Sequence, residues 1–228
     1  DALRKRSSAR YVMGEDTARA TALGMLKVAR SMDATEIAVL CDGSRFSPEA
    51  LSEVEVLALQ SRTTDDAPAH IRGDYPEWLE ASFTTAFGAD AAAEGEALSR
   101  RAPLDLRVNT LKTMRLKALP ALSEYEAVAG LHSPDAIRIP PRADGRIRPV
   151  QADPLFIKGM VEIQDEGSQI VARLADPQPG QQVLDLCAGG GGKSLAMAAL
   201  MNNKGQIFAT DADARRLAPI HDRIDRAG

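Results

Sequence analysis

Residues 182–194 have the sequence QVLDLCAGGGGKS, the most informative pattern in the chain. The run Val183–Leu186 is typical of a short, mostly apolar strand, and the residues after Lys193 have the apolar spacing of a helix. Between them, four glycines allow the backbone to approach a nucleotide-like ligand closely, while the helix N-terminus presents unpaired N–H groups. The stretch therefore predicts the first strand–loop–helix unit of a doubly wound α/β fold.

A second predicted strand, Gln206–Thr210, ends at Asp211, which lies 19 residues after Gly192. An acid at the end of the second strand of such a fold is placed to accept hydrogen bonds from ribose hydroxyls. The loop and the acid together favour a cofactor with a free ribose. The candidate cofactor-binding residues are Cys187, Ala188, Gly189, Gly190, Gly191, Gly192, Lys193 and Asp211.

Three other interpretations of the loop remain open. A phosphate-binding P-loop is matched at its end by Gly192-Lys193-Ser194, but Cys187 stands where its first glycine belongs. A nicotinamide-binding G-x-G-x-x-G motif fits Gly189 and Gly191 but has Ser194 at its third glycine. A glycine-rich turn that only packs tightly is the third, although successive glycines cost stability unless something requires them. S-adenosylmethionine is the cofactor that the pattern favours.

Upstream of this unit, the composition of the sequence and the spacing of its apolar residues predict further domains. Residues 1–73 form a helical N-terminal segment that ends in a polar linker, with helix expected from Asp1 to Val39 and a further helix start at Ser47-Pro48-Glu49. Residues 74–160 form a small α/β domain, whose first helix opens at residues 74–79 and should stop at Gly88. Residues 161–228 begin the cofactor-binding domain. The strands expected before the glycine-rich loop are 106–109, 136–139 and 161–164.

The composition excludes several classes of protein. The net charge of −4 argues against coating nucleic acid by bulk charge, although a local basic groove is still compatible with it. The two cysteines, Cys41 and Cys187, are too few for a disulfide scaffold or a cysteine-based zinc site, and we expect no metal. Two cysteines far apart in sequence fit free thiols in a reducing cytosol, so we expect a cytoplasmic protein. Since no apolar run is long enough to span a bilayer, we expect no membrane partner.

Three motifs resemble the Sun/NOL1/NOP2 family of RNA 5-methylcytosine methyltransferases. Asp185–Lys193 is similar to the family's cofactor motif Asp-x-Cys-Ala-Ala-Pro-Gly-Gly-Lys, but Gly189 and Gly190 stand where the family commonly has Ala-Pro. The segment Ile163–Gln169, IQDEGSQ, resembles the preceding Gln-Asp-x-x-Ser-Gln, and Leu106–Thr110, LRVNT, resembles a stretch of the RNA-binding linker domain. The basic start of the chain resembles the end of a NusB-like domain, as in bacterial 16S rRNA enzymes of this type.

The resemblance implies a class I, Rossmann-like methyltransferase domain that uses S-adenosylmethionine and acts on RNA, with ribosomal RNA favoured over transfer RNA. It makes Arg107 and Asn109 candidates for RNA contact, beside the alternative that they belong to a plain strand of the linker domain. It gives no indication of the oligomeric state.

Methylation at C5 of cytosine needs a thiolate that adds to C6. The resemblance implies two cysteines for this step, in Pro-Cys and Thr-Cys motifs downstream of the second strand, and the chain ends at Gly228 before either. We therefore expect a truncated methyltransferase domain with no catalytic residue in this chain, inactive by itself. The alternative is a non-catalytic RNA-binding or assembly module that retains the cofactor loop.

Overall fold

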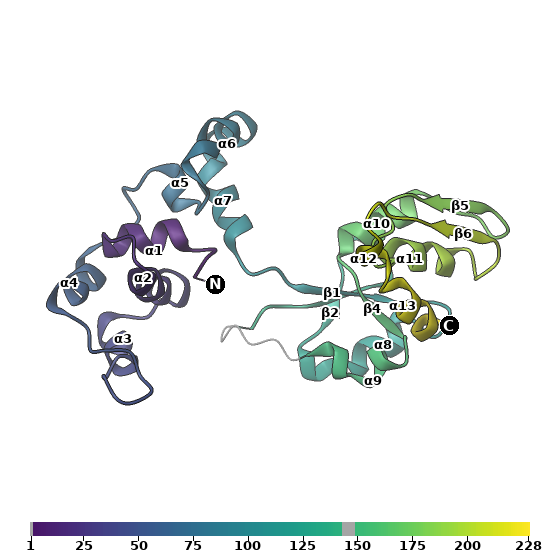
Figure 1. Ribbon diagram of the computed structural model, residues 1–228, viewed down its shortest axis with the longest axis horizontal. Helices are drawn as coiled ribbons and strands as arrows, with labels where there is room; N and C mark the ends of the chain where they lie inside the picture. Colours follow the sequence, from purple (N-terminus) through teal and green to yellow (C-terminus); the bar gives the residue numbers. More distant parts are fainter. Residues whose placement is uncertain (1, 143–148) are drawn as a thin grey trace. The chain divides into compact units, whose positions relative to one another are not determined.

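The computed structural model describes residues 2–142 and 149–228, so Asp1, where the expected N-terminal helix begins, lies outside the described residues. The chain divides into two compact units, Asp1–Arg101 and Ala102–Gly228 (Figure 1). Within the described ranges, no helix is both long and apolar enough to cross a membrane.

The first unit is built from helices around a small apolar core. They are α1 (Arg6–Met13), α2 (Ala18–Arg30), α3 (Ala34–Leu40), α4 (Glu53–Ser61), α5 (Ala69–Arg72), α6 (Glu80–Phe87) and α7 (Ala91–Ser99), with the 3-10 turns η1 (Glu77–Leu79) and η2 (Gly88–Asp90). Leu23, Ile37 and Leu59 lie at the centre of the core, each at most 4% exposed. Since this core gathers side chains from α2, α3 and α4, these helices stabilise one another by apolar packing.

The N-terminal stretch expected as continuous helix up to Val39 consists of three helices. Gly14 adopts a left-handed conformation (φ 73°) and ends α1, and Ser31 does the same (φ 53°) after α2. The side chain of Thr17 caps the start of α2, and Asp33 forms a capping box with Glu36 at the start of α3. These local hydrogen bonds satisfy N–H groups that an uninterrupted helix would use internally, so the chain turns at both places.

The helix start expected at Ser47-Pro48-Glu49 is wrong. Helix α4 begins instead after Ser52, whose hydroxyl accepts a hydrogen bond from the backbone N–H of Glu55, while the Glu55 carboxylate accepts one from the N–H of Ser52. This reciprocal pair satisfies two backbone donors and is a stronger start signal than a serine followed by proline.

The second unit begins with a four-stranded antiparallel sheet in the order β2-β3-β1-β4. Its strands are β1 (Leu104–Val108), β2 (Val128–Ala129), β3 (Ala136–Ile139) and β4 (Val161–Ile163). The connections contain α8 (Arg115–Ala121), η3 (Ser123–Tyr125), η4 (Val150–Ala152) and α9 (Pro154–Ile157). The three strands expected from sequence are confirmed, and β2 is an addition. The core on this sheet is fully buried at Leu106, Leu122 and Ile137.

The same unit continues into a parallel pair of strands, β5 (Gln182–Asp185) and β6 (Gln206–Ala209). Helix α10 (Glu166–Leu174) precedes the pair, α11 (Gly192–Leu200) joins its strands, and α12 (Ala214–Leu217) and α13 (Ile220–Ala227) follow (Figure 1). Val183 and Ile207 pack against buried residues of α10 and α11. The strand–helix–parallel strand arrangement confirms the predicted start of a Rossmann-like fold.

Candidate functional site

The glycine-rich loop lies at the carboxyl end of β5, where doubly wound folds bind their ligands. Gly189 (φ 52°) and Gly191 (φ 79°) are both in left-handed conformations that side chains disfavour. A Cβ at Gly191 would also come within 2.4 Å of Cγ1 of Ile220 on α13. Two of the four glycines are therefore required by the backbone itself.

Asp211 connects the loop to the second strand. Its Oδ2 accepts a hydrogen bond from the N–H of Gly189 (2.9 Å), and its Oδ1 accepts one from the N–H of Asp213 (2.9 Å). The Asp213 hydrogen bond is the main cause that lowers the pKa of Asp211, and the Gly189 N–H and Arg216 add to the effect. A carboxylate with one backbone donor on each oxygen keeps further lone pairs, so it can still accept hydrogen bonds from ribose hydroxyls.

The two strands and the helix between them hold the loop in place. The Ser194 hydroxyl on α11 donates to Oδ2 of Asp185 (2.8 Å), and the N–H of Ala188 donates to the carbonyl of Thr210 (2.9 Å). The spacing in the sequence predicted that the glycine-rich loop and Asp211 lie near each other, and in the structure they are in direct contact. The side chains of Cys187 and Lys193, by contrast, are exposed.

A buried polar cluster lies beneath the loop. Glu162 on β4 has a side chain only 1% exposed, and it accepts hydrogen bonds from Arg223 and Arg226 of α13. Arg223 also donates to the carbonyl of Gly190 (2.8 Å). The same guanidinium therefore binds the antiparallel sheet and the glycine-rich loop.

Arg107 and Asn109, the candidates for RNA contact, are 5% and 3% exposed. Nε of Arg107 donates to Oε1 of Gln164 (2.7 Å). Nδ2 of Asn109 donates to the carbonyls of Gly159 and Ala227 (3.0 Å each) and so secures the end of α13. In this structure both side chains bind within the fold, since Arg107 lies on β1, a central strand of the sheet, and Asn109 follows directly after it.

Burial lowers the pKa of Arg107 to about 10, with nearby Arg223 adding to the effect and Glu162 opposing it. The guanidinium therefore remains charged at neutral pH. Among the described residues, no carboxylate lies within ion-pair distance of it, and its hydrogen bond to Gln164 is its only side-chain partner.

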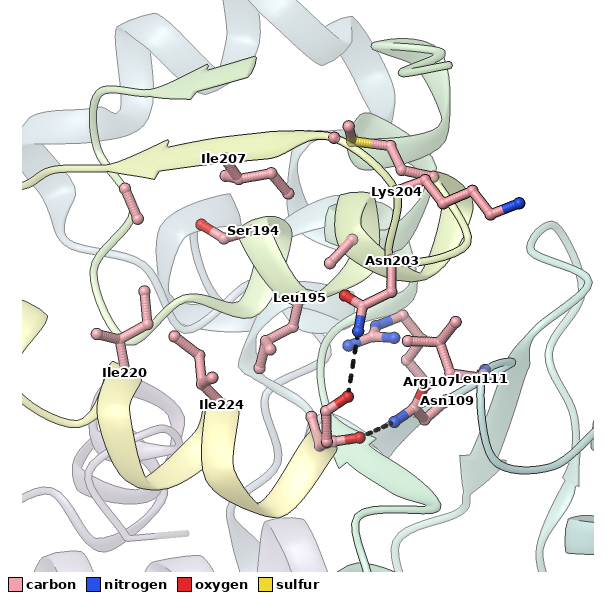
Figure 2. A pocket seen from close by; sticks show the side chains of 16 residues that line it. Arg107, Asn109, Leu111, Ser194, Leu195, Asn203, Lys204, Ile207, Ile220 and Ile224 are labelled. Carbon is pink, nitrogen blue, oxygen red and sulfur yellow. Dashed lines mark hydrogen bonds between the residues drawn. The ribbon is translucent and has the colours of Figure 1, made fainter. Parts of the chain in front are cut away.

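A cavity of about 210 Å³ lies nearby, between α11, α13 and the turn before β6 (Figure 2). Figure 2 shows Arg107 and Asn109 at one side of it and Ile220 and Ile224 of α13 at the other. Its lining includes Ser194 but neither Asp211 nor any residue from Cys187 to Lys193. The cavity is thus separate from the ligand-facing side of the loop.

The sequence did not single out Glu162, Gln164 or Arg223 as site residues. Gln164 was visible only as part of a motif, and Arg223 only as one of the charges on an amphipathic helix. The pairing of Glu162 with Arg223 joins residues 61 positions apart, and no local pattern could have predicted it.

Comparisons with known proteins match two parts of the chain to domains of RsmB/F-type methyltransferases. Residues 172–228 match the family model described as 16S rRNA methyltransferase RsmB/F, and residues 75–144 match an RsmF/B-like, ferredoxin-like domain. The chain is 35% identical over 162 residues to a probable ribosomal RNA small subunit methyltransferase B of Synechocystis (68% of this chain, 34% of the relative). It is 37% identical over 161 residues to a ribosomal RNA small subunit methyltransferase B of Sodalis glossinidius (69% and 36%).

A solved structure of a methyltransferase homologue from Pyrococcus horikoshii is also similar. It matches with a TM-score of 0.60 and 26% identity over 70% of this chain and 52% of that one. The chain spans about a third of the length of the curated relatives it matches.

Proposed function

Because this chain belongs to the Sun/NOL1/NOP2 family of RNA 5-methylcytosine methyltransferases, we propose that it binds S-adenosylmethionine for methyl transfer to C5 of a cytosine in RNA. Ribosomal RNA is the favoured substrate, since the matched relatives are named as ribosomal RNA methyltransferases. The proposed cellular location of this activity is the cytoplasm.

The contact between Gly189 and Asp211 is the observation that carries the proposal. Oδ2 of Asp211 lies 2.9 Å from the backbone nitrogen of Gly189, at the carboxyl ends of two parallel strands, which supports a role of this acid in ribose binding. This donor and acceptor set fits a nucleoside with free 2′ and 3′ hydroxyls. It fits a phosphate-only ligand poorly, because the carboxylate would repel the anion.

The residues of this chain have distinct roles in the proposal. Asp211 holds the ribose, and the backbone from Cys187 to Lys193 lines the cofactor, as the family resemblance implies. When bound, S-adenosylmethionine supplies an electrophilic methyl group on a sulfonium. Asp185, Ser194 and Arg223 position the loop through the hydrogen bonds described above.

Neither cysteine of these 228 residues is assigned as the nucleophile of C5 chemistry. Cys41 is buried in the helical core of the first unit, 4% exposed, and Cys187 belongs to the cofactor loop. Both follow a leucine rather than the Pro or Thr that the family motifs contain.

Isothermal titration calorimetry tests the cofactor. The wild-type chain should bind S-adenosylhomocysteine in preference to ATP, and Asp211→Ala should weaken that binding at least about tenfold, as expected for lost hydrogen bonds to a charged group. Asp222→Ala, on the exposed surface of α13, is the matched control and should bind like wild type. Tighter binding of ATP, or full affinity in Asp211→Ala, would contradict the proposal.

Filter binding with ribosomal and transfer RNA transcripts tests the substrate. We expect tighter binding to 16S rRNA fragments than to transfer RNA at the same salt concentration, because salt alone changes such affinities strongly. Equal affinity for both would remove the preference for ribosomal RNA.

A further inference from the structure

Gln164 holds an unused hydrogen-bond donor beneath the glycine-rich loop. The residue is 6% exposed, and its Nε2 lacks a partner, alone among the buried side-chain nitrogen and oxygen atoms of the described residues. Buried polar atoms are nearly always paired, because an unmet donor costs free energy. An exception in a family motif beside a ligand-binding loop indicates a donor whose partner is a ligand.

Three other polar side chains of the same motif are engaged within the fold. Asp165 caps α10 by accepting from the N–H of Ser168, and Glu166 accepts from the N–H groups of His132 and Ser133. Nε2 of Gln169 donates to the carbonyls of Leu106 and Gln164. The motif thus fixes the backbone around Gln164 and leaves its buried amide nitrogen available.

The free amide is directed at the start of α11. A Cβ on Gly192, the first residue of this helix, would lie 3.5 Å from Nε2 of Gln164 and 3.8 Å from a terminal nitrogen of Arg223. The first turn of a nine-residue helix adds unpaired backbone N–H groups and a partial positive charge at the same place. Donors from three sources therefore converge beside Gly192.

The charges around this point favour an anion. Arg223 and Arg226 both pair with the buried carboxylate of Glu162, and Arg107 lies nearby without an ion pair of its own, so these three arginines outnumber that carboxylate. Oε1 of Gln164 is already occupied by Arg107, which orients the amide so that its nitrogen faces away from that guanidinium.

We propose that Gln164 Nε2, together with the N-terminus of α11, binds the carboxylate of the cofactor's amino-acid end. This inference rests on the proposed function, and it adds a residue that recognises the amino-acid part of the cofactor, separately from the ribose held by Asp211. The group recognised is a carboxylate, so a cofactor fragment without it should not depend on Gln164.

Gln164→Glu is the decisive variant. Its carboxylate still accepts the hydrogen bond from Arg107 and adds an ion pair to it, so the melting temperature of the free chain should not fall. The amide donor is lost, and a negative charge faces the ligand carboxylate. The dissociation constant for S-adenosylhomocysteine should rise about 10- to 100-fold, the range for a hydrogen bond to a charged group.

Two comparisons separate this role from a general disturbance. Methylthioadenosine, which has the nucleoside but no amino-acid end, should bind wild type and Gln164→Glu with the same affinity. Gln206→Glu adds the same charge at an exposed position at the start of β6 and should leave both affinities unchanged. Calorimetry measures all of these dissociation constants on the full chain.

A second variant tests the same place without altering Gln164. Gly192→Ala introduces a methyl group beside the amide at ordinary van der Waals distance and without backbone strain, because φ at Gly192 is not positive. This variant should weaken the binding of S-adenosylhomocysteine more than the binding of methylthioadenosine. The stability of the helix should be kept or increased.

Each outcome decides the inference. A selective loss of affinity for S-adenosylhomocysteine in both variants supports it. Unchanged affinity in Gln164→Glu, equal loss of both ligands, or loss of RNA binding alone would overturn it, while the Asp211→Ala result would still stand for the cofactor. If wild type binds neither ligand, the proposed cofactor is wrong and the inference falls with it.

Discussion

Gly191 is restricted by two features that a side chain would violate. Its φ of 79° is left-handed, and a Cβ would lie 2.4 Å from Cγ1 of buried Ile220. Gly180 has a similar φ of 91°, but no atom lies within 4 Å of its Cβ position. A comparison of substitutions at the two glycines therefore separates the cost of backbone strain from the cost of a steric clash.

We predict that Gly191→Ala destabilises the chain more than Gly180→Ala does. Strain at a positive φ costs about 1–3 kcal/mol in either variant. Displacement of Ile220 should add about 1–3 kcal/mol in Gly191→Ala only, as overpacking of a well-filled region does. Urea unfolding followed by circular dichroism measures both, and equal losses would show that Ile220 moves aside at no cost.

The lowered pKa of Asp211 predicts how its loop contacts depend on pH. A carboxyl group whose pKa is depressed in the folded state stabilises the fold above its ordinary pKa of about 4, and this contribution is lost as the pH falls through the depressed value. The amide resonance of Gly189 should therefore be constant from pH 7 to about 5 and should shift only below about pH 4. Asp211→Asn should remove that shift, and an unchanged titration in this variant would assign it to another group.

The sequence predicted some of these residues and not others, for a physical reason. Gly189, Gly191 and Asp211 could be singled out because their positions depend on backbone conformation and on spacing between two successive strands. Arg107 and Asn109 were candidates for RNA contact, with a plain strand of the linker domain as the alternative, and the sequence did not show that both are covered, since burial depends on which strands flank β1. The strands that flank β1 pair with it across 29 or more positions, as Arg107 does with Ala136 and with Glu162.

At the scale of elements, α13 is held to β4 by one buried carboxylate. Arg223 and Arg226 lie on the same face of the helix, and both donate to Glu162. Arg226 also lies over the ring of Phe156, 4.2 Å from its centroid. Because Arg223 also donates a hydrogen bond to the carbonyl of Gly190, the attachment of α13 fixes the loop as well.

We predict that Glu162→Gln loosens α13 and the loop together. Removal of one partner from a buried charge cluster costs about 3–5 kcal/mol, and the partial exposure of both arginine side chains should bring the loss toward or below the lower end. Hydrogen exchange should accelerate in α13 and at Gly190–Gly191 more than in β1 and β3. Asp222→Asn, on the exposed side of α13, is the control and should exchange like wild type.

Exchange that accelerates equally across the antiparallel sheet would contradict this role, because it would show that Glu162 stabilises β4 rather than α13. The result also bears on how the proposed cofactor site is built. A loop positioned by an arginine from a following helix depends on that helix for its shape, which a strand–loop–helix motif by itself does not reveal.

The helices show where local sequence signals are sufficient. The end of α6 at Gly88 was predicted and is confirmed, since that residue has a positive φ of 57°. The single N-terminal helix was wrong because Ser31 ends α2 in a left-handed conformation that serine adopts rarely. Reciprocal caps such as Ser52 with Glu55 were present in the sequence, but the nearby Ser47-Pro48 drew the prediction to the wrong start.

At the scale of the whole molecule, the two sheets of the second unit are not equally covered. The antiparallel sheet has a fully buried core at Leu106 and Ile137, whereas the parallel pair has one face against α11 and another that is largely open. On that open face Leu184 is 58% exposed and Phe208 is 44% exposed. A two-stranded sheet with one covered face is marginally stable.

We predict a matching gradient of hydrogen exchange along the chain. Amides of β5 and β6 should exchange faster than those of β1 and β3, because local opening needs less free energy where fewer apolar side chains are buried. S-adenosylhomocysteine should slow exchange in β5, the glycine-rich loop and β6, since a ligand that binds only the folded site stabilises it in proportion to its saturation. The helices α2 to α4 of the first unit should exchange at the same rate with and without it. Protection that spreads equally to both units would show that the ligand stabilises the chain as one cooperative body, and protection confined to the first unit would place the cofactor site elsewhere.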